Sequence, residues 1–201
     1  MILQRAYIIS WLGNKDIARA RLEMLKNVVS WCKDKNLMPC IIAMEWEESW
    51  YSEFVDADFI KVPFKMPPGH ARNIGLNHLY STEDDFGIFL DDDTYIETGE
   101  DLVTSIQNWE LENVEGVDVI TVIDPEKKDQ YVELDKYHRL RGAKMITSGV
   151  FIVKNIRKYY PEGKDLWFSP HFVNVVDDGE EKLIFGEDVH FGNRAHFFEY
   201  G

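Results

Sequence analysis

The stretch GIFLDDD, residues 87–93, places three consecutive aspartates directly after a short apolar run. An uninterrupted run of this kind predicts a buried strand. Asp91, Asp92 and Asp93 therefore follow the carboxyl end of that strand. In an open α/β sheet, ligands bind outside this end of the strands. The stretch predicts an α/β fold and marks the edge of the sheet at which a ligand would bind.

Similar apolar runs alternate with helical patterns on both sides of this stretch. Further strands are predicted at residues 6–12, 39–44, 59–64, 117–123 and 146–154, and helices at residues 17–35, from the turn at 67–69 to 80, at 101–112 and at 186–198. Residues 126–144 are charged and mixed in pattern, helical at best. This alternation is typical of a mostly parallel sheet with helices on both faces. With 201 residues and no linker or repeat, we expect a single domain.

The predicted helix at residues 17–35 has the clearest amphipathic pattern. Its apolar face carries Ala18, Leu22, Leu25, Val29 and Cys32 at helical spacing. Asn14 or Asp16 could cap its amino end. The only two cysteines, Cys32 and Cys40, both lie in apolar settings. We expect core thiols and no disulfide framework, which fits a reducing compartment.

The composition restricts the class of protein. Hydrophobic residues make up 45% and aromatic residues 13% of the chain, which indicates a globular protein rather than a disordered one. The 22 basic and 36 acidic side chains leave a net charge of −14, which argues against generic binding to nucleic acid or to an anionic membrane. No stretch reaches the length of a membrane span, and the first apolar run is too short for a signal peptide. We therefore expect a cytoplasmic protein.

The three aspartates suggest a divalent cation. Adjacent carboxylates repel one another, so their placement costs stability unless solvent or a cation offsets it. A hard ion such as Mn²⁺ or Mg²⁺ takes oxygen ligands and bridges them to diphosphate oxygens. An acidic turn with solvated side chains is the alternative. A calcium-binding loop is excluded, because its glycine and glutamate positions hold Ile96 and Leu102.

Three motifs, in order along the chain, resemble those of glycosyltransferases with the GT-A fold. They are HARNIGL (residues 70–76), IFLDDD (residues 88–93) and GEDVHFGNR (residues 186–194). The first two are similar to the Ala-Arg-Asn-X-Gly helix start and the strand-borne Asp-X-Asp of the large inverting family that includes cellulose, chitin and chondroitin synthases. The third resembles the Gly-Glu-Asp motif of chondroitin synthase and β-1,4-galactosyltransferase domains. The likeness spans residues 5–198, and residues 92–95 also resemble fringe-like β-1,3 transferases.

The resemblance implies a fold and a division of labour along the chain. The fold would be GT-A, a Rossmann-like and mostly parallel sheet with helices on both faces. Residues 1–95 would form the nucleotide-sugar-binding half, and residues 96–201 the acceptor-side half. The small-residue strand of the acceptor side would include TSGVF, residues 147–151.

The resemblance also implies the donor and metal site. Asp93 would be the direct metal ligand, and Asp91 would lie near the ribose and share the metal. His196, or alternatively His190, would complete the metal site, although a lone histidine is more often structural. The donor-binding residues would be Arg72, Asn73, Asp91 and Asp92. Arg72 could instead form a surface salt bridge, and Asn73 could only cap or orient the turn.

Catalysis is assigned by the same resemblance to the third motif. Inverting transfer needs a general base that takes the proton of the acceptor hydroxyl. Asp188 occupies the position of that base, and Glu187 would bind acceptor hydroxyls. Both acids could instead only cap a helix that begins near Gly186. Tryptophans could stack on an acceptor sugar, but most are expected in the core; they include Trp11, Trp46, Trp50 and Trp167.

The sequence therefore predicts a metal-dependent transferase that uses a UDP- or GDP-sugar. The acceptor would be a glycan, a lipid-linked sugar, a protein or a modified base. A sugar nucleotidyltransferase is an alternative, but the place of its Gly-rich loop, LGNKD at residues 12–16, holds one glycine. A non-catalytic module that binds sugar or metal is the second alternative.

Overall fold

The computed structural model describes residues 4–94, 119–121, 133–134, 140–141, 150–159, 175–177 and 180–182. The helices are α1 (Lys15–Asp34), α2 (Glu48–Tyr51), α3 (Pro68–Leu79) and α6 (Ile156–Tyr159). The strands are β1 (Arg5–Trp11), β2 (Met38–Met44), β3 (Asp58–Val62), β4 (Phe86–Asp91), β5 (Val119–Thr121), β6 (Glu133–Leu134), β7 (Leu140–Arg141), β8 (Val150–Lys154), β9 (Val175–Asp177) and β10 (Glu180–Lys182).

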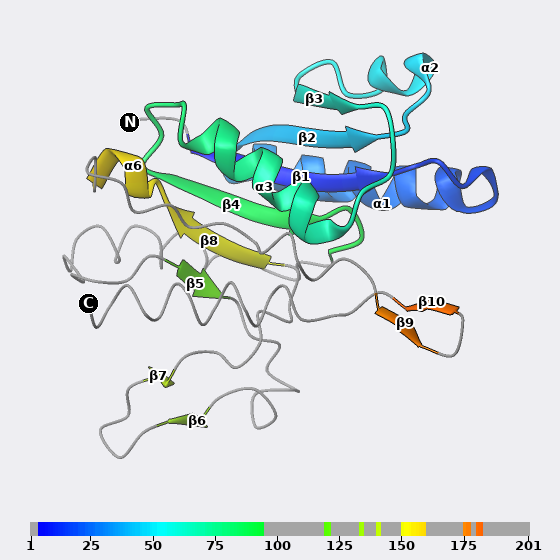
Figure 1. Ribbon diagram of the computed structural model, residues 1–201. Coiled ribbons are helices and arrows are strands. Elements are labelled where there is room, and N and C mark those ends of the chain that lie inside the picture. Colours follow the sequence, from blue (N-terminus) through cyan, green and yellow to red (C-terminus); the bar gives the residue numbers. More distant parts are fainter. Residues whose placement is uncertain are drawn as a thin grey trace.

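Six strands form one sheet in the order β3-β2-β1-β4-β8-β5 (Figure 1). The four strands from β3 to β4 pair in parallel. β8 pairs antiparallel with both β4 and β5, so it is the one strand of this sheet that runs against the others. The prediction of a mostly parallel α/β sheet is confirmed. The direction of β8 was not predicted, because an apolar run has the same pattern in both directions.

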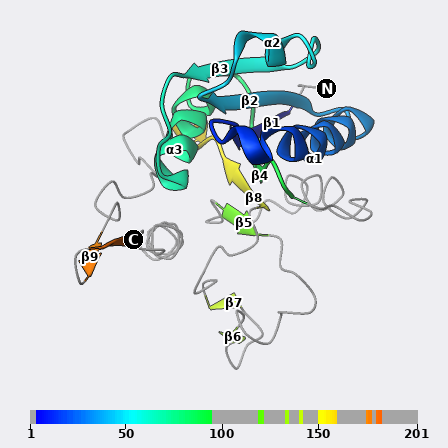
Figure 2. The ribbon, with the colours of Figure 1, turned by 90° about the vertical axis from the view of Figure 1, so that its right-hand side faces the viewer.

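Helices cover both faces of the sheet. Figure 2 shows α1 and α3 on opposite sides of β1, β2 and β4. Ile8 and Ile41 pack in the core under α1, while their neighbours Ile9 and Ile42 pack on the opposite face with Ala71 of α3. This two-residue alternation follows from the pleat of a strand. The same alternation determines the face of the sheet to which each side chain at the end of a strand points.

The ends of the two main helices follow their sequence signals. Asn14 caps α1, because its Oδ1 accepts a hydrogen bond from the backbone N–H of Asp16 at 3.1 Å. Pro67 is the capping residue of α3 and Pro68 is its first helical residue, where the missing N–H costs nothing. Asn73 lies inside α3, so it does not cap the amino end of that helix, and its predicted role in donor binding stays a prediction.

A glycine brings α3 close to the sheet. A Cβ at Gly75 would lie 2.7 Å from Cε1 of Phe89 and 3.1 Å from Cδ1 of Ile42. Both neighbours are fully buried. Only a residue without a side chain lets the helix approach β4 and β2 this closely, which gives a packing reason for the glycine of the HARNIGL motif.

Other predictions have mixed outcomes. The strands predicted in the first 90 residues match β1 to β4 within two residues at each end, and both cysteines are free and buried. The reading of residues 126–144 as helical at best is corrected, because β6 and β7 within it form an antiparallel pair. The described parts of β6 and β7 have only two residues each, which is too short for a strand pattern to be recognised in a mixed, charged segment. The helices predicted at residues 101–112 and 186–198 lie outside the described residues.

Candidate functional site at the carboxyl edge of the sheet

The three aspartates turn in different directions at the end of β4. Asp91 is the last residue of β4, and its side chain is 35% exposed. Asp92 is fully buried, whereas the side chain of Asp93 is 55% exposed. Since successive side chains point to opposite faces, Asp91 meets α3 and Asp92 meets α1. The aspartates therefore occupy three environments, and Asp93 is the most accessible.

The turn that carries them is closed by hydrogen bonds. The N–H of Thr94 donates to the carbonyl of Asp91 at 3.1 Å. The N–H of Asp91 in turn donates to Oγ1 of Thr94, also at 3.1 Å. The N–H of Asp92 donates to the carbonyl of Ile9 at 3.1 Å, which ties the turn to β1. The backbone on both sides of Asp93 is thus anchored.

Arg72 projects from α3 towards Asp91. One terminal nitrogen lies 3.3 Å from Oδ1 and 3.5 Å from Oδ2 of Asp91. The Arg72 side chain is only 6% exposed, so it is not the surface salt bridge that the sequence left open. Burial raises the pKa of Asp91 above its usual value; Arg72 opposes this rise, and the charge of Asp93 adds to it. The predicted contact of Arg72 with a donor diphosphate stays a prediction.

Asp92 is held by Arg21 of α1. The Nε of Arg21 donates to Oδ2 at 3.3 Å, and a terminal nitrogen donates to Oδ1. Burial raises the pKa of Asp92, while Arg21 and the buried hydroxyl of Ser10 lower it. A direct contact between Asp92 and a donor would require this pair to open. The sequence had placed Asp92 among the donor-binding residues and did not single out Arg21.

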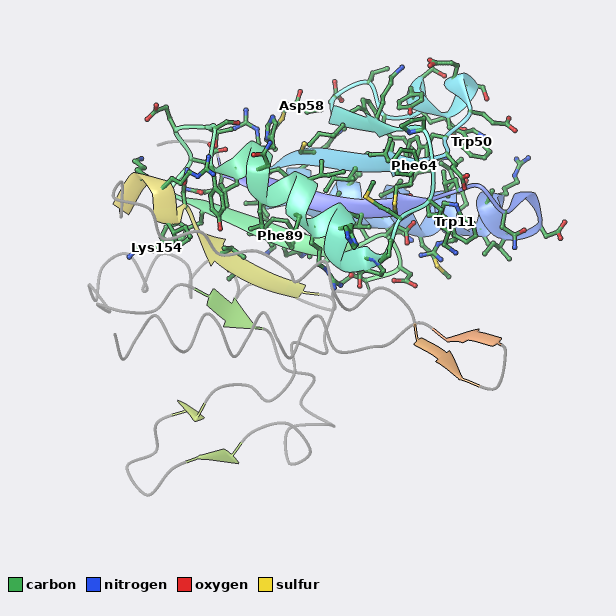
Figure 3. All side chains as sticks on the ribbon, viewed as in Figure 1. Trp11, Trp50, Asp58, Phe64, Phe89 and Lys154 are labelled. Atoms are coloured by element: carbon green, nitrogen blue, oxygen red, sulfur yellow. The ribbon has the colours of Figure 1, made fainter. Side chains whose placement is uncertain are left out.

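A second group of side chains lies at the same edge, beyond β1 and β2. Trp11 ends β1 (Figure 3), and its indole N–H donates to Oε2 of Glu45 at 2.6 Å. The ammonium of Lys65 lies 3.5 Å from the centre of the Trp11 ring. Glu45 directly follows β2 with a φ of 55°, a conformation that costs free energy for any residue except glycine. The sequence pointed to Trp11 only as an acceptor contact and missed Glu45, although it directly follows a predicted strand.

The described residues do not by themselves form a metal site. Among them, no group of three His, Cys, Asp or Glu side chains could hold a metal ion. Asp91 and Asp93 nevertheless supply partly exposed carboxylates two positions apart. Mg²⁺ is often bound by one or two carboxylates together with substrate phosphates and water. The residues fit a hard cation that a diphosphate completes.

The remaining predicted site residues lie outside the part of the chain that the structure describes. They are Glu187, Asp188, His190, His196 and Trp167. Their roles stay predictions. Trp46 and Trp50 are placed, and both are partly buried against the core under α1, as expected for most tryptophans.

Comparison with solved structures supports the fold class. No protein-family model matches the chain, and no curated protein matches it either. The mannosyltransferase PcManGT of Pyrobaculum calidifontis, solved with GDP-mannose and Mn²⁺, matches with a TM-score of 0.56 and 12% identity over 96% of this chain and 51% of that one. TarS of S. aureus, residues 1–349 with UDP-GlcNAc, matches with a TM-score of 0.62 and 14% identity over 98% of this chain and 54% of that one.

A third similar structure comes from another class of enzyme. CMP-2-keto-3-deoxy-manno-octonic acid synthetase, in complex with CTP, matches with a TM-score of 0.55 and 11% identity over 82% of this chain and 80% of that one. This chain spans about half the length of the two transferase structures. At these identities the similarity shows the fold alone. That fold is an α/β, Rossmann-like sheet of the GT-A type with helices on both faces.

Within the described residues, none of the helices combines the length and apolar character that a membrane crossing requires.

Proposed function

We propose that the chain is a glycosyltransferase that moves a sugar from a nucleotide-diphosphate donor to an acceptor hydroxyl, with inversion and with Mn²⁺ or Mg²⁺. The observation that carries this proposal is the pair Asp91 and Asp93, partly exposed at the carboxyl edge of the sheet. Transferases of similar fold have been solved in complex with GDP-mannose and Mn²⁺ or with UDP-GlcNAc. These ligands make UDP- and GDP-sugars the first donors to test.

The proposed roles follow the chemistry of sugar transfer. When bound, the divalent ion would stabilise the negative charge that grows on the leaving diphosphate. Asp93 and Asp91 would hold it, with His196 as a further ligand. Arg72 lies beside Asp91, where its planar guanidinium could donate charge-assisted hydrogen bonds to the donor. Asn73, on the same helix, would support donor binding.

The acceptor side depends on residues of the third motif. Asp188 would take the proton from the acceptor hydroxyl as the sugar carbon forms its new bond, and Glu187 would bind acceptor hydroxyls. A single displacement assisted by one base inverts the anomeric configuration. We assign residues 1–95 to the donor and residues 96–201 to the acceptor. Two buried free thiols fit a reducing compartment such as the cytoplasm.

Metal-dependent nucleotide binding tests the proposal directly. Calorimetry should detect UDP or GDP binding to the wild type with Mn²⁺ and much weaker binding after chelation. Asp93→Ala should abolish the Mn²⁺-dependent part and leave the fold intact, because it removes a carboxylate that repels Asp91. Asp56→Ala is the matched control, since Asp56 is an exposed acid paired only with Lys33 among the described contacts. Unchanged metal-dependent affinity in folded Asp93→Ala would place the site elsewhere.

A sugar nucleotidyltransferase is the second candidate. The observation that favours it is the similar synthetase, 80% of whose length this chain covers. The two activities differ in their products. A nucleotidyltransferase releases pyrophosphate from a nucleoside triphosphate and a sugar, whereas a glycosyltransferase releases a nucleoside diphosphate from a sugar nucleotide. Pyrophosphate release, without consumption of any sugar nucleotide, would decide for the synthetase class.

A further inference from the structure

Arg21 occupies an unusual position for a cation. It lies three residues after Ala18 and four before Leu25, two buried residues of the apolar face of α1. A guanidinium on such a face loses hydration, which costs free energy unless a partner replaces the water. The partner is Asp92, whose carboxylate is fully buried. The pair therefore ties the amino-terminal half of α1 to the turn after β4.

This tie acts on the neighbouring residue of the turn. Arg21 grips Asp92 with two different nitrogens, and one of them also lies 3.7 Å from Oδ2 of Asp93. The turn itself is closed by Thr94 and joined to β1 through the Asp92 N–H. Arg21 thus contacts the residue before Asp93 directly and the Asp93 carboxylate through charge.

We propose that Arg21 is a positioning residue for the Asp93 carboxylate: it fixes Asp92 beneath the turn and holds the Asp93 side chain where a divalent cation binds. This inference rests on the proposed function, because it assumes that Asp93 binds a cation. A bound cation would replace the charge contact between Arg21 and Asp93, while Arg21 would keep its hydrogen bonds to Asp92. Groups behind metal ligands commonly change metal affinity by about 10- to 100-fold when they are replaced.

An arginine is needed here because of its shape. Its planar guanidinium presents two nitrogens to the two oxygens of Asp92. The terminal one of these nitrogens carries a second N–H and also lies near Asp93. Lysine has the same charge but presents it as a point. Arg21→Lys therefore separates geometry from charge.

The test uses Mn²⁺ alone as the probe, with free Mn²⁺ measured by electron paramagnetic resonance. Background binding to the acidic surface is subtracted with Asp93→Ala. We expect Arg21→Lys to weaken the Asp93-dependent site about 10-fold or more, with UDP affinity in the presence of Mn²⁺ falling in parallel. Arg19→Lys is the control, because Arg19 is an exposed arginine on the same helix. A folded Arg21→Lys protein with the Mn²⁺ affinity of the wild type would overturn the proposal.

A second variant covers the case in which Arg21→Lys does not fold. Arg21→Met combined with Asp92→Leu removes both charges, keeps the net charge, and replaces a buried pair by apolar side chains, which proteins often tolerate. The expected loss of Mn²⁺ affinity is again about 10-fold, and wild-type affinity would again overturn the proposal.

Two further outcomes are distinguishable. A wild type that binds neither Mn²⁺ nor nucleotide overturns the proposed function, and the role of Arg21 with it. If the wild type binds both and the Arg21 variants bind Mn²⁺ as tightly as the wild type, the proposed function stands and the positioning role fails. Without metal, Arg21→Lys should also speed hydrogen exchange at the amides of Asp92 and Thr94, which the present turn protects; unchanged exchange contradicts the tie.

Discussion

The two ends of β1 and β4 each carry arginine–aspartate contacts, and the contacts differ in what surrounds them. At the amino end, Arg5 of β1 donates to Asp84, whose side chain is 5% exposed and also accepts from Oγ1 of Thr82 at 3.1 Å. The Nδ2 of Asn155 lies within 3.2 Å of the carbonyl oxygens of Leu79, Thr82 and Asp84. Asp84 and Asn155 are buried, so this end, near Lys154 in Figure 3, is a polar network largely withdrawn from solvent, although Nε of Arg5 and Oδ1 of Asn155 have no hydrogen-bond partner among the described residues.

The carboxyl end uses the same residue types but remains open. Arg21 holds Asp92 and Arg72 holds Asp91, whereas more than half of the Asp93 side chain is exposed. Ligands of open α/β sheets bind at this end because the strands and their loops diverge there. An arginine–aspartate pair alone therefore does not mark a functional site. What distinguishes the candidate site is an accessible aspartate, Asp93, beside two aspartates that arginines hold, at the carboxyl end of the sheet.

The largest expected effect is a loss of turnover without a loss of stability, which would distinguish a catalytic acid from a structural one. Asp188→Asn removes the proposed general base, which typically costs about 10²- to 10⁴-fold in rate. The amide can still cap a helix, so the thermal midpoint should be nearly unchanged. Turnover should fall while the apparent affinity for the donor stays the same. Steady-state kinetics and analysis of the product anomer measure both points.

Two results would contradict that assignment. Near-normal turnover of Asp188→Asn would leave Glu187 or another residue as the base. A product that retains the donor configuration would exclude a single displacement with one base. Either result leaves the proposed donor site at the carboxyl edge unaffected, because that site depends on Asp91 and Asp93.

The opposite behaviour is expected at the amino end. Asp84→Ala leaves Arg5 without its closest partner and should lower the free energy of unfolding by about 2–3 kcal/mol, less than for a fully buried pair, since Arg5 is 25% exposed. Nucleotide affinity of the folded variant should equal that of the wild type. Urea denaturation and calorimetry measure the two quantities, with exposed Asp56→Ala as the control. Weaker nucleotide binding by folded Asp84→Ala would break the distinction between the two ends.

The sequence predicted the central sheet well because its strands are continuous apolar runs. β1, β2 and β4 are buried on both faces. Strands of this kind can be recognised in the sequence without knowledge of the strands beside them. The direction of β8 could not be predicted from its own residues, because it depends on how the chain connects β8 to the strands beside it. The four-residue helix α2 is too short to show a helical period.

The sequence predicted where the three aspartates lie, but not which residues contact each of them. Three adjacent aspartates indicated the edge of the sheet, but the burial and the contacts of each one depend on arginines from α1 and α3. A signal for one partner was present: Arg21 falls on the apolar face of α1, where an unpaired cation is unfavourable. Pairing it with Asp92 required the alternation along β4 and the packing of α1 under it. A helix pattern considered alone cannot supply that information.

The smallest expected effect concerns how closely α3 brings Arg72 to the edge. Gly75→Ala gains about 0.5–1 kcal/mol of helix propensity. The new Cβ would meet Phe89 at 2.7 Å and Ile42 at 3.1 Å, and overpacking of a core typically costs about 1–3 kcal/mol. The ring of Phe89 has little room to yield, because it is fully buried and stacked on Tyr7 at 5.0 Å. We therefore expect a net loss of about 1 kcal/mol.

A double variant shows whether the close approach is the cause of this loss. Gly75→Ala combined with Phe89→Leu removes the ring atom nearest to the new Cβ. The double variant should lose less stability in urea than the sum of the two single variants, because the two sites share one contact. The outward shift of α3 in Gly75→Ala should also weaken Mn²⁺-dependent nucleotide binding slightly, since Arg72 rides on that helix. Additive losses would show that the contact with Phe89 is not the cause of the loss. A Gly75→Ala protein more stable than the wild type would show that helix propensity outweighs the packing and that the glycine does not set the position of Arg72.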